Sequence, residues 1–280
     1  MLTINCKGRL ITFEEPLVMG IINATPDSFY EASRIKQSEE VIRKAEQMLL
    51  DGATLLDVGG QSTRPGSQRV SEEEELQRVI PAVETIAKNF PLALISIDTF
   101  YAKVARYAVE AGAALVNDVS AGSIDAELIP AVAQLGVPYV LMHMQGDPQT
   151  MQTAPHYDNV VLEVYDTLNF KLAELHAAGI NDIIIDPGFG FGKTIDHNFT
   201  LLSHLTYVQQ LGKPVLVGIS RKGTIYKTLD ITAEEALNGT TALNTIALMN
   251  GAQILRVHDV KEARQAIQLY LATQKQKEQL

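Results

Sequence analysis

The chain has 280 residues, of which 46% are hydrophobic and 20% charged, so it holds enough apolar material for one large core. A formal net charge of −10 argues against nucleic acid and against an anionic membrane surface as the main partner. No apolar run approaches the roughly 18 residues of a membrane span, the N-terminus lacks the apolar region of a secretory signal, and the single cysteine, Cys6, cannot form an intrachain disulfide, so we expect a cytoplasmic protein.

Strand-like and helix-like segments alternate along the chain, after a short hairpin that turns at Lys7-Gly8. Buried strands are expected at 17–23, 54–58, 93–98, 114–119, 139–143, 183–186, 215–219 and 254–257. Helical patterns are expected at 38–50, 71–88, 102–111, 126–134, 160–178, 197–210, 233–249 and 261–273. The segment 24–37 is expected to be a loop.

This order predicts a (β/α)8 barrel, in which eight parallel strands close into a ring and each strand is followed by a helix. We expect residues 1–280 to form a single domain, with the N-terminal hairpin closing the bottom of the ring. A doubly wound open sheet is the alternative. That fold usually has a glycine-rich turn after its first strand, whereas Asn23-Ala24-Thr25-Pro26-Asp27 occupies the position here.

Polar side chains arrive where the predicted strands end. Since residues two apart in a strand share a face, apolar positions early in each strand lead to a polar one at its C-terminal end. Six strand ends carry such residues, namely Asn23, Asp98, Asn117, Asp186, Lys222 and Arg256. Active sites of β/α barrels lie at that end. Carboxylates and amides suit a flat ring rich in N–H groups, and Lys222, Arg256 and His258 suit an anion, so we predict a site for a planar ring joined to a phosphate.

Two long loops add to this prediction. Residues 59–66 combine glycines, hydroxyls and one arginine, as a phosphate-facing loop would, although an ordinary glycine-rich turn is the alternative. Neither this loop nor residues 23–30 resemble a Walker A sequence, and no His/Cys spacing indicates a metal site. We interpret His143 as a structural histidine, and the run Glu72-Glu73-Glu74-Glu75 as the solvated start of a helix.

From about residue 17 to 260 the chain resembles the dihydropteroate synthase family of the folate pathway. The resemblance is carried by eight short motifs in the family's order: Met19–Phe29, Gly59–Gly66, Ser96–Thr99, Asn117–Ser120, His143–Gly146, Asp186–Lys193, Ser220–Lys222 and Arg256–Asp259. Each motif is short, but the ordered set is specific. The resemblance implies a pterin-binding domain over about 17–265.

The resemblance implies condensation of 6-hydroxymethyl-7,8-dihydropterin diphosphate with 4-aminobenzoate to 7,8-dihydropteroate, with release of pyrophosphate, help from Mg²⁺ and competition by sulfonamides. It also implies a homodimer. By this resemblance the pterin ring would be held by Asp98, Asn117, Asp186 and Lys222, with Arg256 stacked on it. The diphosphate would be bound by Asn23, Arg64, Arg256 and His258, and Mg²⁺ by Asn23. The aminobenzoate would be framed by Phe29, Thr63, Pro65, Phe191 and the Ser220–Lys222 turn, and Met142 would be a further substrate-binding residue. The catalytic residues would be Asp98, Asp186, Lys222 and Arg256.

The chain departs from the family pattern in three places. Gln61 replaces the usual Glu, residues 29–34 replace a glycine-rich continuation, and Gly223 stands where a serine often contacts the aminobenzoate carboxylate. Gly223 motivates one alternative, a pterin-binding barrel without synthase activity. A methyltetrahydrofolate:corrinoid methyltransferase is another, but its chemistry needs no diphosphate site, so Arg64, Arg256 and His258 count against it.

Overall fold

The computed structural model describes residues 2–24, 31–61, 69–146, 151 and 154–277. Eight parallel strands form the central sheet in the order β8-β7-β6-β5-β4-β3-β10-β9. A parallel bridge between Ile185 and Val215 joins β8 to the segment entering β9, which closes the ring. The predicted (β/α)8 barrel is therefore confirmed, and the open doubly wound sheet is excluded.

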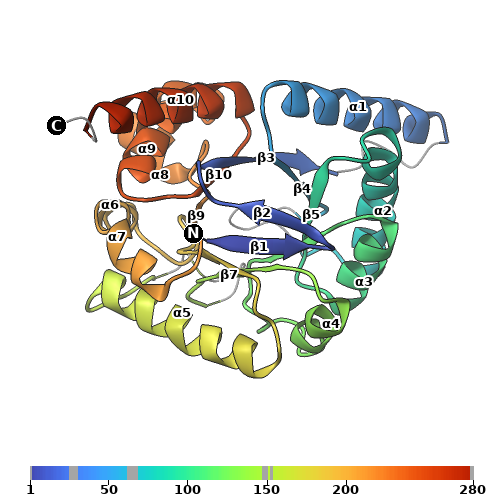
Figure 1. The fold of residues 1–280 in the computed structure, drawn as a ribbon, viewed down its shortest axis with the longest axis horizontal. Helices are drawn as coiled ribbons and strands as arrows, with labels where there is room; N and C mark the ends of the chain where they lie inside the picture. Colours follow the sequence, from blue (N-terminus) through green and yellow to red (C-terminus); the bar gives the residue numbers. More distant parts are fainter. Residues whose placement is uncertain (1, 25–30, 62–68, 147–150, 152–153, 278–280) are drawn as a thin grey trace.

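The strands are short and largely buried, as expected of parallel strands covered by helices. Their bounds are β3 Leu17–Asn23, β4 Leu55–Gly59, β5 Leu94–Asp98, β6 Leu115–Asp118, β7 Tyr139–Met142, β8 Ile183–Asp186, β9 Leu216–Val217 and β10 Ile254–Val257. Helices surround the ring on the outside (Figure 1). Their bounds are α1 Glu31–Leu50, α2 Glu72–Asn89, α3 Ala102–Ala111, α4 Leu128–Leu135, α5 Val160–Ala177, α6 Ile195–Ser203, α7 Leu205–Val208, α8 Gly223–Leu229, α9 Leu237–Met249 and α10 Val260–Lys277.

The N-terminal hairpin of β1 (Thr3–Cys6) and β2 (Arg9–Thr12) lies across the ring (Figure 1). Its turn residues Lys7 and Gly8 have φ of 50° and 88°, the left-handed pair that tight hairpin turns require. The side chains of Ile4 and Cys6 are buried among apolar residues from the beginning of the barrel strands, such as Leu55 and Leu94. The hairpin therefore closes the N-terminal end of the barrel, as predicted.

Three helix predictions need correction. The helix α1 begins at Glu31, so the predicted loop to residue 37 is wrong; residues 31–37 contain no glycine or proline that would stop a helix. The predicted helix 197–210 is divided at His204, where the Ser203 hydroxyl donates to the carbonyl of Thr200 and competes with the helical pattern. The segment predicted as one helix from 233 begins only at Leu237, and the additional helix α8 precedes it. In the described part of the chain, no helix is long and apolar enough to cross a membrane.

Candidate active site

The polar strand ends meet at the C-terminal mouth of the barrel. Strand register places Gly59 beside Asp98 and Asp98 beside Asn117. On the other side of the ring, Asp186 is paired with Met142. Only 9% of Asp98, 4% of Asn117 and 6% of Asp186 is exposed, so these polar groups are held within the mouth and need partners there.

One hydrogen-bonded cluster crosses the inside of the ring. Arg256 donates from Nε to Oδ2 of Asp57 at 2.6 Å and from Nη2 to Oδ2 of Asp98 at 2.6 Å. Asn117 donates from Nδ2 to the same Asp57 oxygen at 3.0 Å. The cluster thus joins β10, β4, β5 and β6, and we call these four residues the arginine cluster.

Asp57 is a member that the sequence interpretation missed. It is fully buried, and its Oδ1 has no hydrogen-bond partner among the described residues. The signal in the sequence was a carboxylate inside the apolar run Leu55-Leu56-Asp57-Val58, two residues after Leu55 and hence facing the barrel interior. A buried charge at such a position requires a cation, and Arg256 supplies it.

The charges of the arginine cluster shift one another's ionisation. Burial raises the pKa of Asp98 to about 7, with the charge of Asp57 adding to the shift and Arg256 opposing it. Burial disfavours the charge of Arg256, but the attraction of Asp57 and Asp98 raises its pKa on balance, so the guanidinium stays charged. The cluster therefore presents a fixed cation beside a carboxyl group that titrates near neutrality.

A second group of charges lies around Asp186. Its Oδ1 accepts a hydrogen bond from the backbone N–H of Gly188 at 2.7 Å. Lys222 donates to the carbonyl of Phe189 at 2.6 Å, and its ammonium lies 4.5 Å from the centre of the Phe191 ring. Burial raises the pKa of Asp186 against the opposing charge of Lys222, and burial lowers the pKa of Lys222 to about 8 against the attraction of Asp186.

Gly218 lies where the two groups meet. A Cβ atom added there would be 3.9 Å from Oδ2 of Asp186 and 3.9 Å from side-chain carbons of Arg256. The carboxylate of Asp186 and the guanidinium stem of Arg256 therefore face the same space. Acceptors and cations from both groups therefore lie together at the barrel mouth, a combination that suits a planar, polar ligand with an anionic part.

The remaining predicted residues lie at the edge of this mouth or outside the described residues. Asn23 is exposed at the end of β3, beside Gly59. His258 is exposed after β10, with Nδ1 3.1 Å from Oγ of Ser220. Met142 and Phe191 belong to an apolar cluster that also contains Phe100. Four predicted residues lie outside the described residues, namely Phe29, Thr63, Arg64 and Pro65.

The described residues include no group of three His, Cys, Asp or Glu side chains that could hold a metal ion by themselves. Asn23 offers one exposed amide oxygen. Mg²⁺ commonly keeps several waters and takes one or two protein ligands together with substrate phosphates. A single oxygen at the rim therefore fits an ion that arrives with a diphosphate, and it does not fit a permanently caged metal.

Comparison with known proteins adds independent findings. The family described as pterin binding enzyme matches residues 19–258. Dihydropteroate synthase of Escherichia coli strain K12 is 44% identical over 274 residues, which cover 97% of this chain and 96% of that protein. The structure of Yersinia pestis dihydropteroate synthase in a sulfonamide drug complex has a TM-score of 0.92 at 41% identity and covers 98% of this chain and 100% of that one.

A Xanthomonas albilineans dihydropteroate synthase with 4-aminobenzoic acid has a TM-score of 0.89 at 43% identity, with 97% of this chain and 98% of that chain covered. Both relatives share the fold over nearly their whole length, and the family match spans every strand that contributes to the mouth of the barrel. The chain therefore belongs to the pterin binding enzyme family and, within it, to the dihydropteroate synthases, which are transferases of folate biosynthesis.

Proposed function

We propose that the chain condenses 6-hydroxymethyl-7,8-dihydropterin diphosphate with 4-aminobenzoate, forming 7,8-dihydropteroate and pyrophosphate. The observation that carries the proposal is the set of buried acceptors and cations at the barrel mouth, with Arg256 bound to Asp57 and Asp98 on one side and Asp186 beside Lys222 on the other. This arrangement occurs in a chain that belongs to the dihydropteroate synthases.

In this proposal the pterin ring occupies the space between the two groups of charges. Asp98, Asn117 and Asp186 would accept hydrogen bonds from the N–H groups of the pyrimidine part, and Lys222 would donate to a ring acceptor. Arg256 would lie against the ring face while it remains bound to Asp57. Because Arg256 is already held by two carboxylates, it would be oriented before the ligand arrives.

The diphosphate would lie at the rim, where Asn23, Arg64, Arg256 and His258 are proposed to bind it. Mg²⁺ would be held by Asn23, water and the diphosphate oxygens, and when bound it would supply positive charge to the leaving group. Arg64 and His258 would neutralise the same oxygens from the protein side. The pterin ring would thus be bound by buried residues inside the barrel mouth, and the diphosphate by exposed residues at its rim.

The aminobenzoate would enter over the apolar cluster of Met142 and Phe191, with Thr63 and the Ser220–Lys222 turn beside it. In the reaction, the bond between the exocyclic methylene carbon and the diphosphate oxygen breaks, and the amine nitrogen forms a bond to that carbon and loses one proton. An SN1-like route suits the site, because the electron-rich pterin delocalises the positive charge and the carboxylates of Asp98 and Asp186 stabilise it. The structure of the Yersinia pestis relative is that of a sulfonamide drug complex, and we expect sulfonamides to compete with the aminobenzoate in this chain as well.

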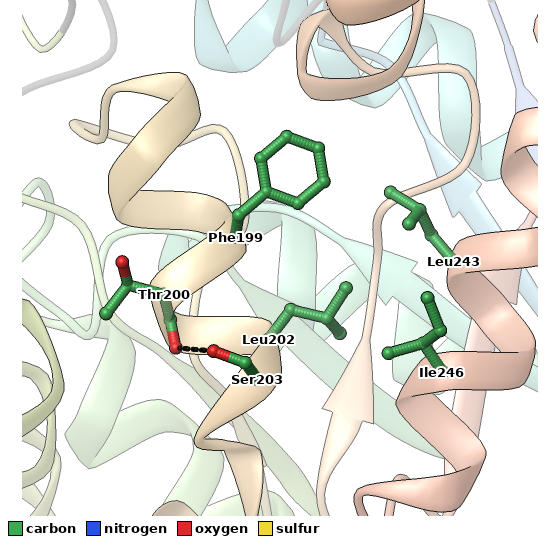
Figure 2. Close-up of a pocket in the computed structure, with 6 residues that line it drawn as sticks. All are labelled: Phe199, Thr200, Leu202, Ser203, Leu243 and Ile246. Carbon is green, nitrogen blue, oxygen red and sulfur yellow. Dashed lines mark hydrogen bonds between the residues drawn. The ribbon is translucent and has the colours of Figure 1, made fainter.

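We also propose that the protein is a cytoplasmic homodimer of single-domain chains, with residues 1–280 forming one barrel and the pterin-binding part spanning about 17–265. An apolar groove lies on the outside of the barrel, between α6 and α9, and we propose it as the surface where the two subunits meet (Figure 2). The groove is lined by Phe199, Thr200, Leu202, Ser203, Leu243 and Ile246. Sedimentation of the wild type and of Ile246→Glu tests this, because a charge there would separate the subunits.

Purified protein mixed with both substrates and Mg²⁺ should release pyrophosphate and form dihydropteroate. Lys222→Ala should lose most of this activity and keep nearly the wild-type melting temperature, since Lys222 faces the site and not the outer core. Binding of the pterin diphosphate by calorimetry without any turnover would show a pterin-binding protein that has lost the synthase reaction. Absence of both binding and turnover would overturn the proposal.

A further inference from the structure

Lys193 ends the turn that follows β8 and is almost completely buried, with 3% exposed. Its ammonium lies 2.9 Å from Nδ1 of His143 and donates to the carbonyls of Gly188 at 3.0 Å and Phe191 at 3.1 Å. None of these hydrogen-bond partners in the described part of the chain is a carboxylate. Burial, followed by the charge of Lys193, lowers the pKa of His143 to about 3, so the imidazole is neutral and accepts at Nδ1.

The ammonium holds a turn that only glycines can form. Gly188, Gly190 and Gly192 have φ of 74°, 80° and 59°, all in the left-handed region. A Cβ on Gly188 would lie 1.8 Å from the carbonyl oxygen of His143, so the backbone approaches β7 closely. Phe189 and Phe191 of the turn are buried in apolar clusters, and the two carbonyls bound by Lys193 hold the backbone at Gly188 and Phe191.

The same turn joins the two charged residues on its side of the site. Its Gly188 N–H donates to Asp186 at 2.7 Å, its Phe189 carbonyl accepts from Lys222 at 2.6 Å, and its Phe191 ring lies 4.5 Å below the Lys222 ammonium. A movement of the turn would therefore move the partners of both Asp186 and Lys222. Lys193 makes no described hydrogen bond to either of these side chains, although its charge attracts Asp186 and repels Lys222.

We propose that Lys193 is a positioning residue, whose buried ammonium holds the turn 188–192 so that Asp186 and Lys222 are oriented for the pterin ring. The assignment rests on the proposed function for the identity of the ligand. The physical argument is that a buried cation is costly unless its hydrogen bonds are made, and an apolar side chain would fill the same volume without that cost. The four acceptors around Lys193, which include the carbonyl of His143 at 3.5 Å, all belong to the turn or to the strand end beside it.

The test compares Lys193→Met with Leu168→Ala, a cavity variant in the outer core at α5 that serves as the control for lost stability. Binding of 6-hydroxymethylpterin is measured by calorimetry, and kcat and KM for both substrates are measured on the folded proteins. We expect Lys193→Met to bind the pterin about tenfold more weakly, because unpaired buried carbonyls let the turn shift, whereas Leu168→Ala binds like the wild type.

A double variant, Lys193→Met with Lys222→Met, gives a readout that a general loss of stability would not change. Because Lys193 is proposed to act on Lys222 as well as on Asp186 through one turn, the loss in the double variant should be clearly smaller than the sum of the two single losses. Additive losses, or pterin binding by Lys193→Met equal to that of Leu168→Ala, would overturn the proposal. If Lys193→Met does not fold, Lys193→Gln keeps two donor hydrogens and should show a smaller loss in the same direction.

Pterin binding and dihydropteroate formation by the wild type show whether the proposed function or the role of Lys193 is at fault. If the wild type neither binds the pterin nor forms dihydropteroate, the proposed function is wrong, and Lys193 cannot orient residues for a pterin. A wild type that does both, combined with unchanged binding in the Lys193 variants, contradicts the assignment alone.

Discussion

The two ends of the barrel interior are built from the same strands and carry opposite kinds of side chain. At the N-terminal end, Leu55, Leu94 and Leu115 pack against Ile4 and Cys6 of the hairpin and exclude water. Two to four residues further along the same strands lie Asp57, Asp98 and Asn117, which belong with Arg256 to the arginine cluster. Since a strand rises about 3.3 Å per residue, the interior changes from apolar to ionic within roughly 7–13 Å.

This difference shows how the barrel separates stability from chemistry. The hairpin covers one end, so the apolar layers below need no hydrogen bonds and can be packed densely. The polar residues at the C-terminal end, which we call the ionic layer, are the arginine cluster together with Asp186 and Lys222. They lie on the apolar layers, and their charges are oriented by one another and by the turn after β8. We therefore expect substitutions at the hairpin to change the free energy of unfolding and substitutions in the ionic layer to change activity, with Arg256 changing both.

Arg256→Met should give the largest effect, because it removes the cation that Asp57 and Asp98 share. Leaving these carboxylates unpaired should cost about 3–5 kcal/mol in the free energy of unfolding at pH 8. Because Arg256 is proposed to contact the pterin and its diphosphate, its loss should also lower kcat/KM by about 100- to 1000-fold. Urea unfolding and steady-state kinetics on the same preparation measure the two losses.

Arg264→Met is the matched control for this variant. Arg264 is paired with Glu15 at 3.6 Å, and the two side chains are 35% and 54% exposed. Exposed ion pairs contribute about 0–1 kcal/mol, so both stability and kinetics should stay close to the wild type. If the two arginine variants behaved alike, the distinction between the ionic layer and ordinary surface charge would be wrong.

The layout of the barrel was predictable because buried parallel strands are continuous apolar runs and because each is followed by a helical pattern. The polar residues that end these strands also predicted that Asp98, Asn117 and Asp186 lie at one end of the barrel, where the structure places them; their roles toward a ligand stay predictions. Asp57 was missed because its role depends on Arg256, 199 residues away, and no local pattern indicates that pairing. Long-range partners of this kind become visible only when the ring is closed.

Glu75 was misinterpreted for a different reason. The run of four glutamates indicated a solvated helix start, yet Glu75 is fully buried, and its Oε2 accepts from Nε2 of Gln61 at 2.5 Å. Gln61 in turn exchanges two hydrogen bonds with the backbone of Val70, at 3.0 Å and 2.9 Å. The exposed Glu73 and the buried Glu75 are only two positions apart. Glu75 lies four residues before Val79, on the stripe that α2 buries with Ala82, Val83 and Ile86, so the apolar spacing of the helix was the signal that could have placed it inside.

Ile4→Ala tests the other end of the comparison. The side chain of Ile4 is 1% exposed and fills the apolar layer below the site. Its truncation should lower the free energy of unfolding by about 2–4 kcal/mol through lost burial and the cavity that remains. Steady-state kinetics below the melting transition should match the wild type. A fall in kcat/KM that parallels the loss of stability would show that the two ends are coupled.

The smallest effect expected is a pH-dependent one at Glu75. Burial raises the pKa of Glu75 from 4.5 to about 7, with Gln61 opposing the shift. The folded chain therefore binds more protons than the unfolded chain between these pH values, so the free energy of unfolding falls as pH rises through this window and is level above it. From pH 5 to pH 8, the free energy of unfolding of the wild type should fall by up to about 3 kcal/mol more than that of Glu75→Gln.

Unfolding curves for the wild type, Glu75→Gln and Glu73→Gln at several pH values measure this difference. Glu73 belongs to the same helix, but its side chain is 68% exposed, so its replacement should leave the pH dependence of the wild type in place. The charge of Glu75 also raises the pKa of Asp98, so the difference between the wild type and Glu75→Gln includes the change that this substitution causes at Asp98. If the free energies of unfolding of the wild type and Glu75→Gln changed with pH in parallel, burial would not raise the pKa of this carboxyl group. The charged residues that depend on one another would then be confined to the strand ends and would not include Glu75 of α2.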